Sequence, residues 1–444
     1  MNRELEIRKI AVETLIESEN SSIPSHILLR NVLDKYDYFS SFEKALFSKI
    51  VKGTIERRIE LDYIIDLYSK TLSGKMKQVI RIIIESAVYQ IFYMDVYDTV
   101  AVDLAVNLAK KKGFAPLSGF VNGVLRNIVR NKNTIEFPKQ GEPNYLNVRY
   151  SFPSEITDLL LSQYDFETVE KILSSSLESD GVSFRFRYDL PKERREEILK
   201  EIEEKAEIIR SKDFDNVFKA RKAGNISEID AMKNSEITVQ DLSSVIMCEN
   251  VPYGHEILDT CAAPGGKSIY LTEKYPDARI TACDVSVDKL VKMNETVRKK
   301  RLDNITCVKA DASEFRDDFF ERFDVVVADV PCSGLGVVGK KQDIKYRLKE
   351  EDFSYLTTLQ AKIIRNVSKY VKPGGYLCYS TCTINQNENI NIIKDFLKEG
   401  NFSFCPLSVY PKDREEESRN GWLQLLQGFD ETDGFFIAVL KKND

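Results

Sequence analysis

Two cysteines of this chain lie in segments whose composition is typical of loops. Cys332 stands in DVPCSG (329–334), and Cys382 stands in STCT (380–383). Most cysteines are inert buried thiols, but a loop thiol that ionises is a strong nucleophile for covalent catalysis. These two are therefore candidate catalytic residues. The cysteines that we expect to be inert are Cys248, Cys283, Cys307, Cys378 and Cys405.

Two neighbouring thiols suit one reaction on a pyrimidine ring. A thiolate that adds to carbon 6 of cytosine makes carbon 5 nucleophilic, so that carbon 5 can take a methyl group from a sulfonium. The carbon 5 proton must then leave before the thiol is eliminated. Because a free thiol has a pKa of about 8.5, the attacking cysteine needs a positive neighbour, for which Lys267 is a candidate. A protonated Asp329 could hydrogen-bond the ring nitrogen.

A segment of small residues could bring the backbone close to a ligand. It reads DTCAAPGGK over 259–267 and contains two glycines between a predicted strand and a predicted helix. The segment lacks the G-x-G-x-x-G pattern of dinucleotide-binding loops. It also lacks the first glycine of a Walker A loop, because Cys261 stands at that position. Dinucleotide and nucleoside triphosphate binding are both disfavoured.

Three aspartates end three successive predicted strands beside this segment. Asp284 follows Gly266 by 18 residues, near the spacing at which an acid binds ribose hydroxyls. Asp311 could accept a hydrogen bond from an adenine amino group, and Asp329 ends the next strand. Each aspartate alone could also be a helix cap or a solvated loop residue. Together they favour an adenosyl ligand that carries a positive sulfonium over a polyphosphate.

The elements that position these loops alternate from about residue 236 onward. Strands are predicted over 256–260, 278–284, 304–311, 323–330, 374–381 and 434–441, and helices near 266–274, 286–300 and 352–371. This alternation predicts a doubly wound, mostly parallel α/β sheet, in which ligands lie at the carboxyl ends of the strands. The candidate loops all follow those ends.

The preceding part of the chain has a different pattern. Residues 1–130 predict an all-α bundle, in which Ser40 and Glu43 have capping-box spacing. The polar stretch 131–150 predicts a linker. A strand over 182–188 and a charged helix near 191–205 predict a small α+β domain. The predicted domains are 1–138, 145–235 and 236–444.

Composition narrows the class of protein. The first 247 residues contain no cysteine, no C-x-x-C pair occurs, and His26 and His255 are the only histidines, so we expect reduced thiols and no structural zinc. There is no apolar run of 18 residues and no secretion signal at the start, so we expect a cytoplasmic protein. The net charge is −6, but residues 1–140 carry 21 Lys+Arg and 17 Asp+Glu. This modest basic excess fits a module that contacts RNA.

Three of these segments resemble the motifs of a known family. DTCAAPGGK, ADVPCSGLG and YSTCT look like those of RNA 5-methylcytosine methyltransferases of the NOL1/NOP2/Sun family. KGTIERRIELDYII (52–65), YQIFYMD (89–95) and FVNGVLRNI (120–128) resemble NusB, an RNA-binding helical bundle. Their combination is similar to the bacterial RsmB (Sun/Fmu) subgroup.

The resemblance implies a NusB-like all-α bundle, a small α+β domain and a Rossmann-like class I methyltransferase domain. It implies S-adenosylmethionine as cofactor, S-adenosylhomocysteine as its product, and no metal. Cys382 would be the nucleophile, and Cys332 would assist product release, acting as or near the base. The cofactor-binding residues that it implies are Cys261, Ala262, Ala263, Pro264, Gly265, Gly266, Lys267, Asp284, Asp311 and Asp329.

The substrate implied by the resemblance is a loop cytosine of 16S (small-subunit) rRNA near the decoding region. We expect naked rRNA or an early assembly precursor as partner, a monomer, and no membrane. After the Cys332 loop the family shows a basic pair followed by a variable residue and Pro-Asp. Here Gln342 replaces the proline and the pair is lysine, which cannot fork onto phosphate as arginine does.

Several basic side chains could contact RNA phosphates, although each could equally lie on a solvated helix face. They are Lys110, Lys111, Lys112, Arg126, Arg130, Arg185 and Arg187. Two alternatives to the methyltransferase stay open. One is a catalytically inactive NusB-like RNA-binding assembly factor, against which the retained cysteines and carboxylates count. The other is a thiol redox enzyme that pairs Cys332 with Cys382.

Overall fold

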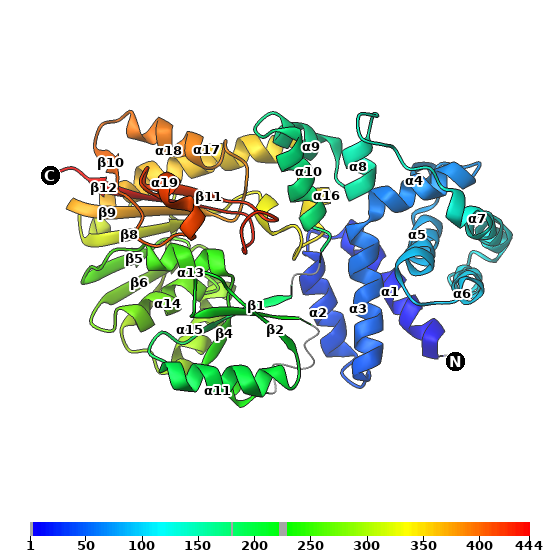
Figure 1. Ribbon diagram of the computed structural model, residues 1–444, viewed down its shortest axis with the longest axis horizontal. Helices are drawn as coiled ribbons and strands as arrows, with labels where there is room; N and C mark the ends of the chain where they lie inside the picture. Colours follow the sequence, from blue (N-terminus) through cyan, green and yellow to red (C-terminus); the bar gives the residue numbers. More distant parts are fainter. Residues whose placement is uncertain (1–2, 179–180, 222–228) are drawn as a thin grey trace. The chain divides into compact units, whose positions relative to one another are not determined.

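The computed structural model describes residues 3–178, 181–221 and 229–444 (Figure 1). The chain divides into two compact units. The helical unit comprises Met1–Leu177 and Val338–Arg347, and the sheet unit comprises Glu178–Val337 and Leu348–Asp444. None of the helices in the described ranges is long and apolar enough to cross a membrane.

The helical unit confirms the predicted all-α bundle. Its main helices are α1 (Arg3–Asn20), α2 (Ser25–Lys35), α3 (Ser41–Glu56), α4 (Arg58–Tyr68), α5 (Gln78–Tyr93), α6 (Asp98–Lys111) and α7 (Ser118–Asn131). The capping box between Ser40 and Glu43 is present at the start of α3. Helix α5 is buried along most of its length, because most of its residues are apolar, and the other helices pack around it.

Residues 131–177 are more ordered than the predicted linker. They form α8 (Tyr145–Tyr150), α9 (Ser154–Leu161) and α10 (Phe166–Ser175), all within the helical unit. The Ser151 hydroxyl accepts a hydrogen bond from the Ile59 amide (2.9 Å), which ties this segment to α4. These helices have 6, 8 and 10 residues, too short for a clear apolar period in the sequence. The predicted three-domain division stays a prediction.

The helical unit also contains Val338–Arg347, which includes α16 (Ile344–Arg347). Asp343 accepts hydrogen bonds from the Ser25 amide (2.8 Å) and from Arg347 (2.6 Å). Lys345 is buried and donates to the Glu56 carbonyl (2.8 Å). Burial lowers the pKa of Lys345 to about 7. Of the lysines in Val338–Arg347, Lys345 is therefore part of the interior of the helical unit, while Lys340 and Lys341 are exposed.

The sheet unit confirms the predicted Rossmann-like α/β architecture. Its strands are β5 (Glu256–Asp259), β6 (Arg279–Asp284), β7 (Ile305–Lys309), β8 (Phe323–Asp329), β9 (Val371–Thr381), β10 (Phe402–Phe404), β11 (Trp422–Leu425) and β12 (Phe435–Lys442). The order is β10-β12-β9-β8-β5-β6-β7, with β11 paired to β12. Strands β5 to β9 are parallel to their neighbours, and β12 is antiparallel to β9.

Helices cover both faces of this large sheet (Figure 1). One face packs against α13 (Leu242–Glu249), α14 (Gly266–Lys274) and α15 (Val287–Lys300), and the other against α17 (Glu350–Val367) and α18 (Ile390–Leu397). Because both faces are buried, the central strands are almost continuously apolar. Polar residues appear where the strands end, which is where the candidate loops begin.

A second, smaller sheet precedes the large one within the sheet unit. It contains β1 (Val182–Phe186), β2 (Glu207–Arg210), β3 (Val217–Arg221) and β4 (Ile237–Val239) in the order β2-β3-β1-β4. Helix α11 (Lys192–Glu203) covers it with Ile198, Leu199 and Ile202. The predicted strand over 182–188 and the predicted charged helix are both present.

Candidate active site

The two loop cysteines lie together at the ends of neighbouring strands. Cys332 follows β8, Cys382 follows β9, and the register pairs Asp329 with Ser380 just before them. The Sγ atoms of Cys332 and Cys382 are 3.3 Å apart. All eight cysteines are free thiols. The sheet therefore brings together two thiols that are separated by 50 positions in the sequence.

The surroundings of Cys332 disfavour the ionised form of its thiol. The pKa of Cys332 is raised well above its usual value, first because its thiol shares a hydrogen bond with Cys382 and then because of burial. Negative charge on Cys382 raises it further. The thiol of Cys332 is therefore hard to ionise while it shares this hydrogen bond.

A lysine–aspartate pair lies at the same strand ends. The Lys267 ammonium donates to Asp329 Oδ2 (2.6 Å), and the Ser380 hydroxyl donates to Asp329 Oδ1 (2.8 Å). Burial disfavours the Lys267 charge, but the Asp329 carboxylate outweighs it, so the pKa of Lys267 is raised. A negative Cys382 raises that pKa as well. Lys267 is thus the positive neighbour that the sequence suggested for the thiolate.

The glycine loop begins after β5 and ends at the start of α14. Gly265 has a φ of 108°, and a Cβ atom there would lie 2.9 Å from the Met293 side chain. Only glycine fits without strain. The Ala262 amide donates to the Cys283 carbonyl (2.7 Å), which fixes the loop against β6. The peptide bond between Ala263 and Pro264 is cis.

Asp284 lies at the end of β6 and Asp311 just after β7, the two strands that follow this loop in the sequence, and the two acids differ in burial. Asp284 is buried and accepts hydrogen bonds from the Ala263 amide (3.1 Å) and the Ser286 amide (2.8 Å). Asp311 is exposed and lines a hollow together with apolar side chains. The other residues that line this hollow are Leu258, Thr260, Cys283, Ala310, Ala312, Arg316, Phe319 and Tyr370. The binding of an adenine amino group by Asp311 stays a prediction.

Asp259, at the end of β5, is a buried acid that was not predicted as a site residue. Its Oδ2 accepts a hydrogen bond from the Ser268 hydroxyl (2.5 Å), and burial raises its pKa to about 6. Its Oδ1 has no hydrogen-bond partner among the residues that the structure describes. Asp259 is the first residue of DTCAAPGGK (259–267), so its position at the end of a predicted strand could have identified it as a site residue.

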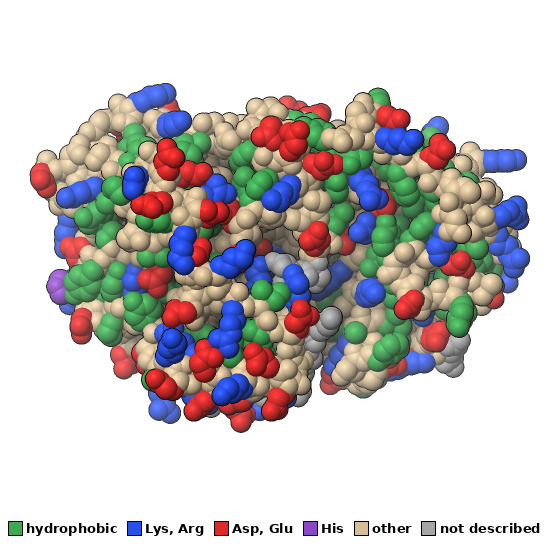
Figure 2. All heavy atoms as spheres, in the orientation of Figure 1, with side chains coloured by type: hydrophobic (Ala, Val, Ile, Leu, Met, Phe, Trp, Pro, Cys, Tyr) green, Lys and Arg blue, Asp and Glu red, His purple; other side chains and the backbone are tan. Residues whose placement is uncertain are grey.

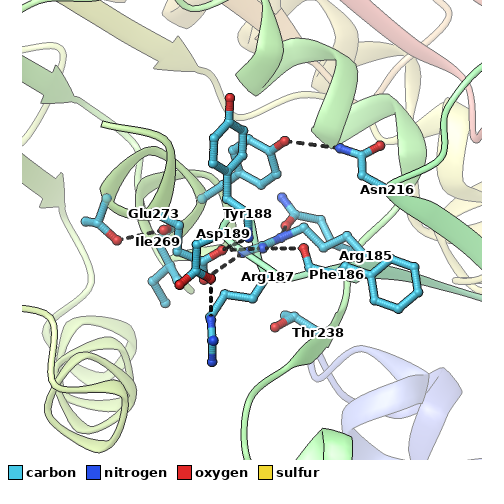
Figure 3. A network of polar contacts seen from close by, with 12 residues as sticks. Arg185, Phe186, Arg187, Tyr188, Asp189, Asn216, Thr238, Ile269 and Glu273 are labelled. Carbon is cyan, nitrogen blue, oxygen red and sulfur yellow. Dashed lines mark hydrogen bonds and ion pairs between the residues drawn. The ribbon is translucent and has the colours of Figure 1, made fainter. Parts of the chain in front are cut away.

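The prediction that Arg185 contacts RNA is wrong. Arg185 is 0% exposed and points into the sheet unit, where it donates to Glu273 (2.5 Å) and Gln240 (2.6 Å) and lies over the Tyr270 ring (Figure 3). A buried guanidinium needs such partners, and here a carboxylate on α14 supplies the charge. Arg187 is partly exposed and pairs with Asp189.

The remaining basic candidates lie in the helical unit and stay predictions. Lys112 is partly buried and pairs with Glu13 (2.7 Å). Exposed side chains remain at Lys110, Lys111, Arg126 and Arg130. On the face shown in Figure 2, lysine and arginine side chains are interspersed with acidic ones and do not form one continuous patch. No cluster of three or more metal-binding side chains occurs within residues 3–178, 181–221 and 229–444.

Comparison with known proteins identifies the family. The family model described as 16S rRNA methyltransferase RsmB/F matches residues 247–441, and the NusB family model matches residues 5–130. The probable ribosomal RNA small subunit methyltransferase B of Bacillus subtilis is 32% identical over 98% of each chain. This chain belongs to the RsmB/F family of S-adenosylmethionine-dependent 16S rRNA methyltransferases.

Other members and solved structures resemble the RsmB/F chain along most of its length. The ribosomal RNA small subunit methyltransferase B of Escherichia coli is 28% identical over 97% of each chain. The crystal structure of PH0851 covers 100% of this chain with a TM-score of 0.81 at 23% identity. NSun6 from Pyrococcus horikoshii, solved with SFG, covers 66% of it with a TM-score of 0.57 at 20% identity. These structures share the fold.

Proposed function

We propose that this RsmB/F family member transfers a methyl group from S-adenosylmethionine to carbon 5 of one cytosine in 16S rRNA. The reaction would pass through a covalent bond between Cys382 Sγ and carbon 6 of the base. The observation that carries the proposal is the 3.3 Å approach of the Cys332 and Cys382 thiols beside the Lys267–Asp329 pair. The names of the full-length relatives support ribosomal RNA as the substrate.

Cys382 acts first. Its thiolate electron pair forms the bond to carbon 6, and the electrons of the ring double bond move toward the ring nitrogen and carbon 5. The Lys267–Asp329 pair lies beside the thiols and donates the proton that the ring nitrogen takes up as the sulfur adds. S-adenosylmethionine supplies the electrophilic methyl group to carbon 5. Its binding residues would be the glycine loop 261–267 with Asp284 and Asp311.

Cys332 acts in release. Two of the causes that raise its pKa come from Cys382, namely the shared hydrogen bond and the negative charge. Both causes vanish once the Cys382 sulfur is bonded to carbon 6, so the pKa of Cys332 falls. Cys332 then gives its own proton to solvent, and its thiolate takes the carbon 5 proton while the electron pair of the S–C6 bond returns to Cys382. One thiol pair thus serves both steps in sequence.

RNA would reach this site through attraction to basic side chains and through extrusion of the target base. We propose that the helical unit, which matches the NusB family, contributes phosphate contacts from its exposed lysines and arginines. The partner is 16S rRNA, either naked or in an early assembly precursor, and we propose a monomer that acts in the cytoplasm. The absence of a metal stays a prediction.

Bisulfite sequencing of rRNA treated with the protein tests the proposal. Wild type should protect one cytosine, and Cys382→Ala should protect none. Cys332→Ala should accumulate a protein–RNA adduct that survives denaturation, because the adduct forms but is not released. If Cys382→Ala methylates rRNA at the wild-type rate, the covalent mechanism is wrong. If wild type methylates no cytosine, the inactive assembly-factor alternative is favoured.

The close approach of the two thiols also suits a thiol redox enzyme. That alternative predicts a reversible disulfide between Cys332 and Cys382 that forms and breaks during turnover, without S-adenosylmethionine. Mass spectrometry of protein alkylated before and after reduction distinguishes the two. We expect both cysteines to be alkylated in the protein as isolated and to stay so through methyl transfer.

A further inference from the structure

A buried carboxylate lies between the two cysteine loops and was not predicted from the sequence. Glu388 is 0% exposed and follows the Cys382 loop in the run NQNEN (385–389). Its Oε2 accepts hydrogen bonds from the Ser333 amide (2.8 Å) and from Gln360 Nε2 (3.0 Å). Its Oε1 accepts one from Asn385 Nδ2 (2.9 Å). One side chain therefore joins the loop after β8, helix α17 and the loop after β9.

The contacts of Glu388 hold Cys332 from both sides. Ser333 directly follows Cys332, and its amide is bonded to Glu388. Gln360, the second partner of the carboxylate, also donates to the carbonyl of Pro331, the residue directly before Cys332 (2.9 Å). The Ser333 hydroxyl lies 2.7 Å from that of Thr383, next to Cys382. The backbone on each side of Cys332 is thus anchored to a group centred on Glu388.

Cys382 is held by strand β9 in addition to the contact of its loop with Glu388 through Asn385. Its neighbours Ser380 and Thr381 belong to β9, where they pair with Ile437 and Phe436 of β12. A change at position 388 therefore perturbs the Cys332 loop more than the nucleophile. Burying a carboxylate is unfavourable unless donors surround it, and an apolar side chain of similar volume would fill the same space at lower cost. If Glu388 fixes the position of the Cys332 loop, that role is a physical reason for an acid at this buried position.

We propose that Glu388 is a positioning residue for Cys332 in the release step. It holds the Cys332 loop so that this thiol stays within reach of Cys382 and of carbon 5 in the adduct. The inference rests on the proposed function, because release has meaning only if Cys382 forms the adduct. All three partners of Glu388 are hydrogen-bond donors, so a glutamine there must turn its own donor toward one of them.

The test compares Glu388→Gln with a matched control, Glu399→Gln. Glu399 lies just beyond α18, has a side chain that is 41% exposed, and pairs with Arg365. We expect Glu388→Gln to lower kcat by about tenfold or more, as loss of one hydrogen bond to a charged group implies. KM for S-adenosylmethionine should stay within about twofold, and a denaturation-resistant RNA adduct should accumulate. Glu399→Gln should match wild type in all three measurements.

A second measurement needs no RNA and reports on the loop alone. Diamide oxidises two nearby thiols to a disulfide and is itself reduced to the hydrazine, taking up both hydrogens. We expect the Cys332–Cys382 disulfide to form several-fold more slowly in Glu388→Gln than in wild type, as measured by mass spectrometry of alkylated peptides. Gln360→Met removes the second anchor of the Cys332 loop and keeps the side-chain length, so its disulfide should also form several-fold more slowly than in wild type. This variant provides the test if Glu388→Gln does not fold.

The outcomes separate this inference from the proposed function. Wild-type turnover and wild-type oxidation rates in both Glu388→Gln and Gln360→Met would overturn the positioning role. Lost turnover with no adduct and an unchanged oxidation rate would also overturn it, because the defect would then lie before release. If wild type itself forms no adduct and no methylated cytosine, the proposed function fails, while the oxidation rates still decide whether Glu388 holds the Cys332 loop.

Discussion

Lys345 offers a measurable consequence of burying a charge in the helical unit. Its ammonium is almost wholly buried, donates to the Glu56 carbonyl and lies over the Phe152 ring at 4.3 Å. Burial lowers its pKa from 10.5 to about 7, which corresponds to about 5 kcal/mol of unfavourable free energy when the group is charged. Replacing it with methionine removes that penalty. The replacement also loses one hydrogen bond, about 1 kcal/mol, and two cation–π contacts, to Phe152 and Tyr346, together about 1–2 kcal/mol.

The sign of the pH dependence follows from the lowered pKa. Between about pH 7 and 10.5 the unfolded chain binds a proton at Lys345 that the folded chain does not, so folding becomes more favourable as pH rises through this window. The penalty is about 5 kcal/mol at pH 6 and about 1.5 kcal/mol at pH 9.5. We therefore expect Lys345→Met to be about 2 kcal/mol more stable than wild type at pH 6, after the lost contacts, and no more stable at pH 9.5.

Urea unfolding of the full chain, followed by circular dichroism at both pH values, measures this difference. Lys49→Met is the control, because Lys49 is exposed on α3 of the same unit and its replacement should leave stability unchanged at both pH values. A Lys345→Met variant that is less stable than wild type at pH 6 would refute the reasoning. So would a stability difference that does not change between the two pH values.

Three further outcomes follow from the contacts described above. Arg185→Met should lower stability by about 3 kcal/mol, because it leaves the buried Glu273 carboxylate with only the more distant Lys300 ammonium (3.8 Å) as a charge partner, and thermal unfolding measures the loss. Asp284→Asn should weaken S-adenosylmethionine binding by about tenfold in calorimetry with little change in melting temperature, since one charge-assisted acceptor is lost. The double substitution Lys110→Gln and Lys111→Gln should reduce the salt dependence of rRNA binding by about two counterions, and an unchanged slope would exclude both from the interface.

The fold could be predicted where local signals are strong. The capping box at Ser40 and Glu43, the alternation of strands and helices after residue 236, and the small-residue loop over 259–267 all depend on residues close in sequence. The proximity of the two loop cysteines was also predictable, because the ends of adjacent parallel strands must lie together. Their 3.3 Å separation is a product of the register between β8 and β9.

The misses involve charged side chains whose partners are distant in the sequence. Arg185 resembles a surface residue until its partner Glu273, 88 positions away, is placed beside it. The burial of Lys345 was not predicted, because its acceptor is 289 positions away on α3. Periodicity reports which face of an element is apolar, and it assigns every charge to the solvent side. Periodicity cannot show which charged side chain will be buried and paired with a partner that is distant in the sequence.

The buried charges Arg185, Lys345 and Glu388 can be separated by what their replacement should change. An internal charge is seldom the most stable choice, because an apolar group of the same shape avoids its desolvation. For Lys345 the replacement should raise stability and leave methyl transfer unaffected. For Glu388 it should leave the melting temperature within a few degrees of wild type and slow release, since the acid sets the position of Cys332. A Glu388→Gln variant that loses stability and activity in parallel would instead place this acid with Arg185, as part of the framework of the sheet unit.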